Sequence, residues 1–98
     1  MATYLMQFSF TQQGIETIKD LLGRAEAAKG VIRQAGGEVQ AYYALLGGQF
    51  DTMFILNAPN DEKVVQMALS IARTGNVRTQ THRLFNEDEI KRIISSLT

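Results

Sequence analysis

Cysteine is absent from the 98-residue chain, and histidine occurs once, as His82. The absence of cysteine excludes a disulfide framework, thiol catalysis and a thiolate metal site. A single histidine is too few for a zinc site that is built from several imidazoles. We therefore expect no metal and no cofactor. The N-terminal stretch, MATYLMQFSF, lacks the basic start of a signal peptide, so the expected compartment is the cytoplasm.

The chain also lacks an excess of charge and any long apolar run. Ten basic and ten acidic residues give a formal net charge of zero. Because a nucleic-acid binder needs surplus Lys and Arg to contact phosphates, we expect no nucleic-acid partner. The longest apolar runs reach about half the length of a membrane-spanning helix, so we expect no membrane partner. An apolar fraction of 45% is ordinary for a globular protein, and residues 1–98 are predicted to form a single domain.

The periodicity of apolar residues predicts the element order β-α-β-β-α-β-α. Alternation with a period of two predicts strands at residues 3–10, 38–46 and 76–85. A run of apolar residues that face both sides predicts a central strand at residues 50–57. Steps of three and four residues predict a long helix after Thr11 with a break near Leu21–Gly23, a second helix after Asn60 or Asp61, and a terminal helix after Asn86. This order is typical of the ferredoxin-like split βαβ fold, an α+β fold with an antiparallel sheet of order 4-1-3-2.

Both long helices of this fold cover the same face of the sheet, which leaves the other face open. Alternation in the first strand places Tyr4 and Met6 under the helices and Leu5 and Gln7 on the open face. Large apolar groups on such a face would form an unusually big exposed patch in a monomer. We expect the terminal helix to cover part of it and a second copy to cover the rest. The expected assembly is a homodimer of the dimeric α+β barrel type, with a trimer packed through sheet edges as the alternative.

Five polar residues are candidate ligand-binding residues: Gln7, Tyr42, Tyr43, Arg78 and His82. Arg78 and His82 share one face of the fourth predicted strand, and adjacent tyrosines point to opposite faces of the second. An imidazole such as that of His82 is suited to proton transfer, and Arg78 is suited to bidentate contact with an anion. If His82 faces the dimer cleft, it would form a polar cluster there with Gln7 and one tyrosine.

The stretch LLGGQFD contains two glycines and an acid, but its context is not that of a phosphate-binding loop. Neither a Gly-Lys-Ser/Thr motif nor a helix N-terminus follows Gly47 and Gly48. A glycine-rich connection of about three residues between two strands predicts a hairpin. We therefore interpret Gly47, Gly48, Phe50 and Asp51 as a structural turn, with Asp51 accepting hydrogen bonds from turn backbone N–H groups.

Several stretches spread along the chain carry a family resemblance: ATYLMQFSFTQQGIETIKD, GGEVQAYYALLGGQFD, NAPNDE and GNVRTQT. Together they resemble the GYD domain family, from Thr3 to about Leu97. The resemblance implies a ferredoxin-like α+β fold and no firmly assigned activity. The family has a Gly-x-Tyr-Asp pattern, and this chain has Phe50 at the tyrosine position, so a role for a phenol hydroxyl there is not expected.

Three functions agree with these patterns. The preferred hypothesis is a homo-oligomeric small-molecule-binding or regulatory module, with its site between the open sheet face and the partner subunit. The second is a cofactor-independent enzyme of the small dimeric-barrel type, an isomerase or monooxygenase with His82 as the proton shuttle. The third is a structural domain that binds another protein through the open face.

Overall fold

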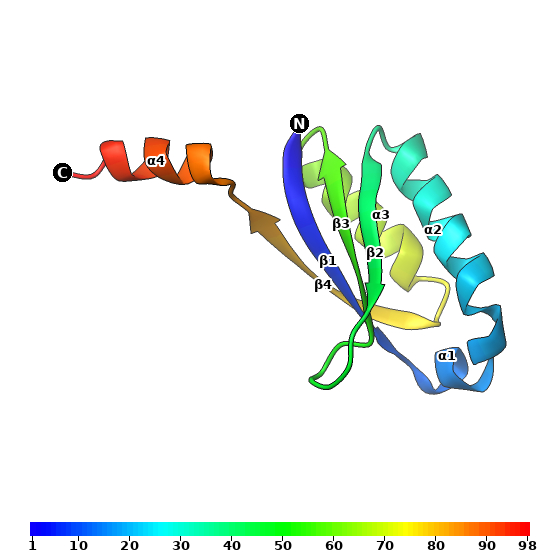
Figure 1. The fold of residues 1–98 in the computed structure, drawn as a ribbon. Coiled ribbons are helices and arrows are strands. Elements are labelled where there is room, and N and C mark those ends of the chain that lie inside the picture. The colour runs from blue at the N-terminus through cyan, green and yellow to red at the C-terminus, as the bar shows by residue number, and fades with distance from the viewer.

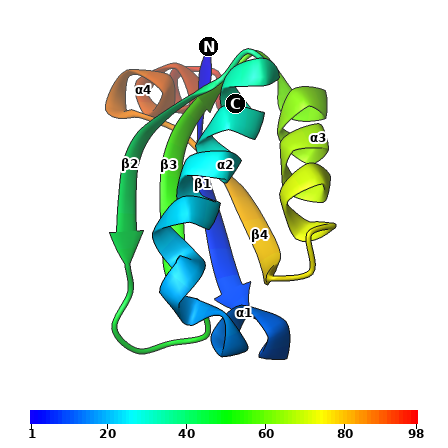
Figure 2. The ribbon, with the colours of Figure 1, turned by 90° about the vertical axis from the view of Figure 1, so that its right-hand side faces the viewer.

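A computed structural model describes all 98 residues. Four antiparallel strands form one sheet, with two long helices on one of its faces (Figures 1 and 2). The strands are β1 (Ala2–Phe10), β2 (Glu38–Ala44), β3 (Thr52–Ala58) and β4 (Val77–Leu84). The helices are α1 (Gln12–Glu16), α2 (Leu21–Gln34), α3 (Asp61–Ala72) and α4 (Glu87–Ser95), with a 3₁₀ turn at Ile18–Asp20. The order β2-β3-β1-β4 confirms the predicted ferredoxin-like sheet.

The core lies between the sheet and the helices, and the central strands supply most of it. Every second residue of β1 and β3 is buried on this side, and β1 confirms the predicted alternation. The largest fully buried side chains are Met6, Ile32, Phe54, Leu56 and Met67. Phe54 contacts Phe8 and Tyr42 edge-on, at ring-centroid distances of 5.1 and 5.2 Å. Such aromatic contacts stabilise a core beyond the area they bury.

The first helical segment is interrupted, as the sequence predicted, but the break lies a few residues earlier. α1 ends at Glu16, and a 3₁₀ turn leads into α2 at Leu21. Arg24 donates hydrogen bonds to the Thr17 carbonyl at 2.9 Å, to the Thr17 hydroxyl at 2.7 Å and to the Gly14 carbonyl at 3.2 Å. The Arg24 side chain thus ties the start of α2 to α1 and to the residue that follows it.

α4 begins with the predicted capping box. The Asn86 side chain accepts from the Glu89 backbone N–H, and the Glu89 carboxylate accepts from the Asn86 backbone N–H. The prediction that this helix covers part of the open sheet face is wrong. α4 extends away from the domain, on the side of the sheet opposite α2 (Figure 1). Its apolar residues Ile90, Ile93, Ile94 and Leu97 are 44–71% exposed, because an amphipathic pattern marks a face for burial without specifying its partner.

None of the helices combines the length and the apolar character needed to cross a lipid bilayer.

Candidate functional site

The face of the sheet opposite α2 and α3, here called the open face, is defined by the strand register. Residues paired across neighbouring strands point to the same face. On this basis the open face comprises Thr3, Leu5, Gln7, Ser9, Glu38, Ala41, Tyr43, Met53, Ile55, Asn57, Arg78, Gln80, His82 and Leu84. Its central strands carry the apolar residues Leu5, Met53 and Ile55 beside the polar Gln7, and polar side chains of β4 lie along one edge. An apolar surface with a few polar groups at its margin is typical of a ligand site.

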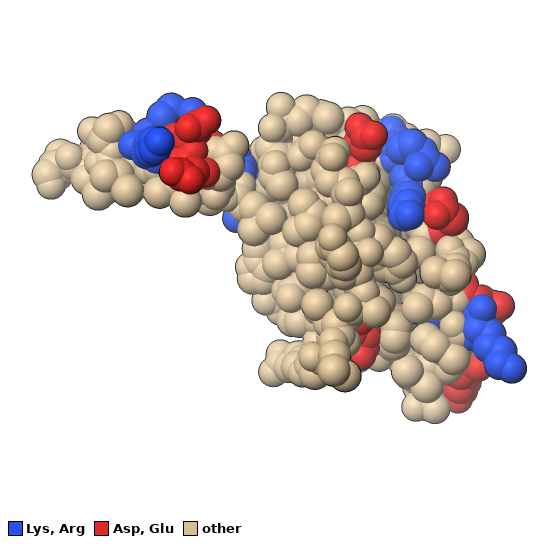
Figure 3. Space-filling model, viewed as in Figure 1, with Lys and Arg blue, Asp and Glu red and all other residues tan.

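The open face lies at the back of a hollow. In the space-filling view, α4 projects above this hollow and the hairpin loop between β2 and β3 projects below it (Figure 3). Charged side chains gather along α2 and on α4, whereas the surface between α4 and the hairpin loop is largely uncharged. The hollow therefore presents a wall with few charges between two projecting segments.

Four of the five predicted ligand-binding residues share this face. Gln7 lies opposite Gln80 on one side and Met53 on the other, and Met53 lies opposite Tyr43. His82 lies two residues beyond Gln80 on β4, opposite Leu5. Arg78 lies at the other end of β4, opposite Ser9.

Tyr42 is separated from the other four because it faces the helices. A β-bulge between Val39 and Ala41 adds one residue, Gln40, to β2. An extra residue moves every later side chain to the opposite face, so Tyr42 rather than Tyr43 joins the core. Burial raises the pKa of the Tyr42 phenol, against the opposing effects of a hydrogen bond with Thr52 and the charge of Arg24. Tyr42 thus stays protonated at neutral pH.

His82 is exposed in this chain, and its only side-chain partner is Gln80. The Nε2 atoms of the two side chains are 3.0 Å apart. A catalytic imidazole is normally oriented by a carboxylate or a carbonyl, and His82 has no such partner here. No group of three or more His, Asp and Glu side chains is arranged to hold a metal ion.

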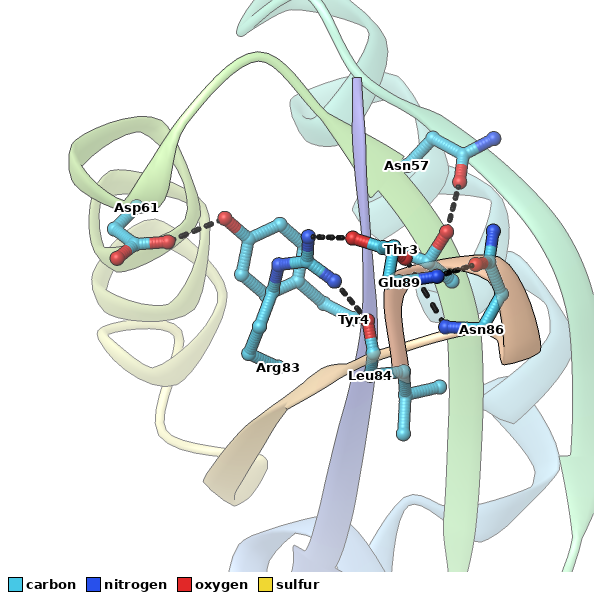
Figure 4. A network of polar contacts seen from close by, with 8 residues as sticks. All are labelled: Thr3, Tyr4, Asn57, Asp61, Arg83, Leu84, Asn86 and Glu89. Atoms are coloured by element: carbon cyan, nitrogen blue, oxygen red, sulfur yellow. Dashed lines mark hydrogen bonds and ion pairs between the residues drawn. The ribbon is translucent and has the colours of Figure 1, made fainter. Parts of the chain in front are cut away.

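A polar network at the edge of β4 was not predicted (Figure 4). The Tyr4 hydroxyl donates to the Asp61 carboxylate, and the Arg83 guanidinium donates to Glu89 at 2.6 Å. Burial and the hydrogen bond to Asp61 raise the Tyr4 pKa. Arg83 also stacks on the Phe85 ring, 4.5 Å from its centroid. The network joins β1, α3, β4 and the start of α4, and it fixes the direction in which α4 leaves the sheet.

No sequence spacing marks this network, because its members are distant along the chain. Tyr4 and Asp61 are 57 residues apart, so only the fold brings them together.

The connection from β2 to β3 contains both glycines of the predicted turn. Gly47 and Gly48 have φ angles of 86° and 81°, a conformation that side-chain-bearing residues rarely adopt. The connection is longer than the predicted three residues, since β2 ends at Ala44 and β3 begins at Thr52. Phe50 is half-buried in this connection.

Asp51 does not bind turn N–H groups as predicted. Its carboxylate accepts from the Phe10 backbone N–H at 2.8 Å, and its own N–H donates to the Phe8 carbonyl at 2.8 Å. Asp51 therefore ties the hairpin to the end of β1.

Replacing Asp51 with alanine should lower the free energy of unfolding by about 1–3 kcal/mol, because a half-buried N–H would lose an ionised acceptor. Asp51→Asn keeps an acceptor oxygen, so we expect it to lower the free energy of unfolding by less than half as much. Urea denaturation followed by circular dichroism measures both changes. Equal losses for the two variants would contradict the assigned hydrogen bond.

The comparisons with known proteins agree with this geometry. An ACT domain protein from Streptococcus pneumoniae superimposes with a TM-score of 0.51 at 12% sequence identity, covering 100% of this chain and 98% of that one. This similarity shows the α+β fold. No curated protein is significantly similar. The family model described as GYD domain matches residues 4–94. Because that match spans almost the whole chain, the protein belongs to the GYD domain family.

Proposed function

We propose that the protein is a homo-oligomeric small-molecule-binding or regulatory module, favoured as a dimer, whose site lies between the open face and the partner subunit. The observation that carries the proposal is the amount of apolar surface left without a partner. It comprises the open face and the apolar side of α4, which border the same hollow.

The exposed surface area of this chain is larger than that expected for a monomer of its mass, which supports an interface with a partner. A folded monomer of this mass is expected to expose about 5,600 Å², and this chain exposes 6578 Å². The radius of gyration is 14.7 Å, whereas a compact domain of this length has a value of about 12.6 Å. The excess area is on the order of 1,000 Å². A stable interface removes about 800 Å² from each partner, so one interface accounts for most of the excess.

A second copy of the chain fits the hollow chemically. Under two-fold symmetry, the apolar side of α4 from one copy packs against the open face of the other, and the reciprocal contact forms automatically. Aliphatic residues lie on both surfaces: Ile90 and Ile94 on α4 would meet residues such as Leu5 and Ile55. The zero net charge of the chain means that two copies do not repel each other at long range.

The polar residues of the open face would lie around the resulting cleft. Gln7 and Tyr43 offer hydrogen bonds near its centre, and Arg78 and His82 offer them along the β4 edge. Such a cleft suits a ligand with an apolar body and one or two polar groups. The exposure of His82 and its lack of an orienting partner favour binding over proton-transfer catalysis.

A crystal structure of the purified protein tests this proposal. We expect two copies with their open faces turned toward each other, enclosing a mainly apolar cleft bordered by Gln7, Tyr43 and His82. Electron density for a small molecule in that cleft would identify the ligand class. A tightly packed interface without a cleft would favour a structural interaction domain, and open faces exposed to solvent would contradict the proposal.

A further inference from the structure

A cavity lies on the other side of the sheet, within a single chain. It occupies about 140 Å³ between α2, the end of α3 and the sheet. Three aromatic rings, those of Phe8, Tyr42 and Phe54, line its sheet side. Apolar cavities of about this size, 150 Å³, can hold a molecule such as benzene. The cavity faces away from the proposed dimer cleft.

The cavity exists because α2 carries small residues at this level. Ala25 and Ala28 line it, and they stand where the apolar stripe of α2 passes over the sheet. One turn further along, Ile32 is fully buried and fills the corresponding space. Larger side chains at the alanine positions would close the cavity, since protein interiors are otherwise packed to crystal-like density.

Arg24 is the only charged residue that lines this cavity. Its guanidinium makes the three hydrogen bonds to Thr17 and Gly14 described above, all with neutral acceptors. A guanidinium has five N–H donors, so two remain for a further acceptor. None of the ion pairs in the protein involves Arg24. Arg24 is thus a fixed cation without a carboxylate partner beside an apolar cavity.

Two polar groups line the sheet side of the cavity, the phenol of Tyr42 and the hydroxyl of Thr52. Burial raises the pKa of Tyr42, and the charge of Arg24 opposes this increase. A ligand seated on the aromatic rings would therefore find its hydrogen-bonding and charged contacts at defined positions around an apolar body.

We propose that this cavity is a second binding site, for a small carboxylate with a ring-sized apolar body whose carboxylate pairs with Arg24. The apolar body fills the space beneath Ala25 and Ala28. Guanidinium and carboxylate groups match in planar, bidentate geometry, which selects a carboxylate over a neutral molecule of the same shape. This site goes beyond the dimer cleft and does not depend on it.

The proposal is tested with benzoate and toluene as probes, by amide chemical-shift titration of the full chain at neutral pH. Benzoate should shift the amides of Ala28, Tyr42 and Phe54. Arg24→Gln should weaken benzoate binding about tenfold, whereas the affinity for toluene should change by less than about twofold. Ala28→Leu should abolish binding of both probes. His82→Ala, on the opposite face of the sheet, should affect neither probe.

Comparison of the two probes separates loss of charge from loss of fold. An Arg24→Gln protein that retains toluene binding is folded around the cavity, so its weaker benzoate binding reports the missing cation. Arg24→Lys provides a further check, because it keeps the positive charge but lacks the planar, paired N–H donors of the guanidinium group. The proposal is overturned if wild-type protein binds neither probe at millimolar concentration. It is also overturned if benzoate shifts only open-face amides, or if Arg24→Gln weakens both probes equally.

Discussion

Gly14→Ala is expected to lower the free energy of unfolding by about 3 kcal/mol, among the larger effects of overpacking. A Cβ atom at Gly14 would lie 2.2 Å from the backbone carbonyl oxygen of Asn76. That carbonyl is held in place, because it accepts from the Thr11 backbone N–H at 3.1 Å. The Thr11 hydroxyl also donates to the Gly75 carbonyl at 2.6 Å, so backbone must move to make room. Urea denaturation measures the loss.

Gly23→Ala is the matched control for this substitution. Gly23 lies in α2, and a Cβ atom there meets nothing within 4 Å. Alanine should therefore stabilise this helix position by up to about 1 kcal/mol. If both substitutions change stability by the same amount and in the same direction, the close packing of α1 against the Gly75–Asn76 turn is not what constrains Gly14.

The second large effect is expected at α4. Replacing Ile90 and Ile94 with glutamine should raise the dissociation constant of the dimer at least about a hundredfold, because each copy would lose two buried apolar anchors. The same change should leave the folded chain intact, since the side chains of Ile90 and Ile94 are already 44% and 59% exposed, respectively, within their own chain. Sedimentation equilibrium measures the dissociation constant, and circular dichroism checks the fold.

Two apolar residues on α3 supply the control for this experiment. Val65 and Leu69 are 57% and 65% exposed, comparable to the α4 pair, but they lie on the helix-covered side of the sheet. Their replacement with glutamine should leave the dimer intact. A dimer weakened equally by both pairs would indicate that exposed apolar residues act non-specifically, and it would remove the special role of α4.

Local signals in the sequence were sufficient to predict the elements and their order. The alternation in β1 gave the correct buried face, and Asn86 with Glu89 forms the predicted capping box. These features depend on residues a few positions apart, whose geometry is fixed by helix and strand periodicity. The order of the sheet then follows from the known arrangement of this element series.

Features that depend on long-range contacts were not predictable in the same way. Alternation alone left open which of Tyr42 and Tyr43 faces the helices, and the bulge at Gln40 decides it. Asp51 binds the Phe10 backbone N–H, 41 residues away in sequence. The amphipathic pattern of α4 predicted a buried helix face but gave no information on the surface that buries it. The cavity beside Arg24 is lined by residues of β1, α2, β2, β3 and α3, so only the fold brings its walls together.

Sedimentation equilibrium of the unmodified protein at low micromolar concentration tests the central claim most directly. If a second copy covers the open face and the apolar side of α4, the measured mass will be twice the 10.9 kDa of one chain. A single-chain mass under these conditions would contradict the dimer, and with it the ligand site between the two open faces.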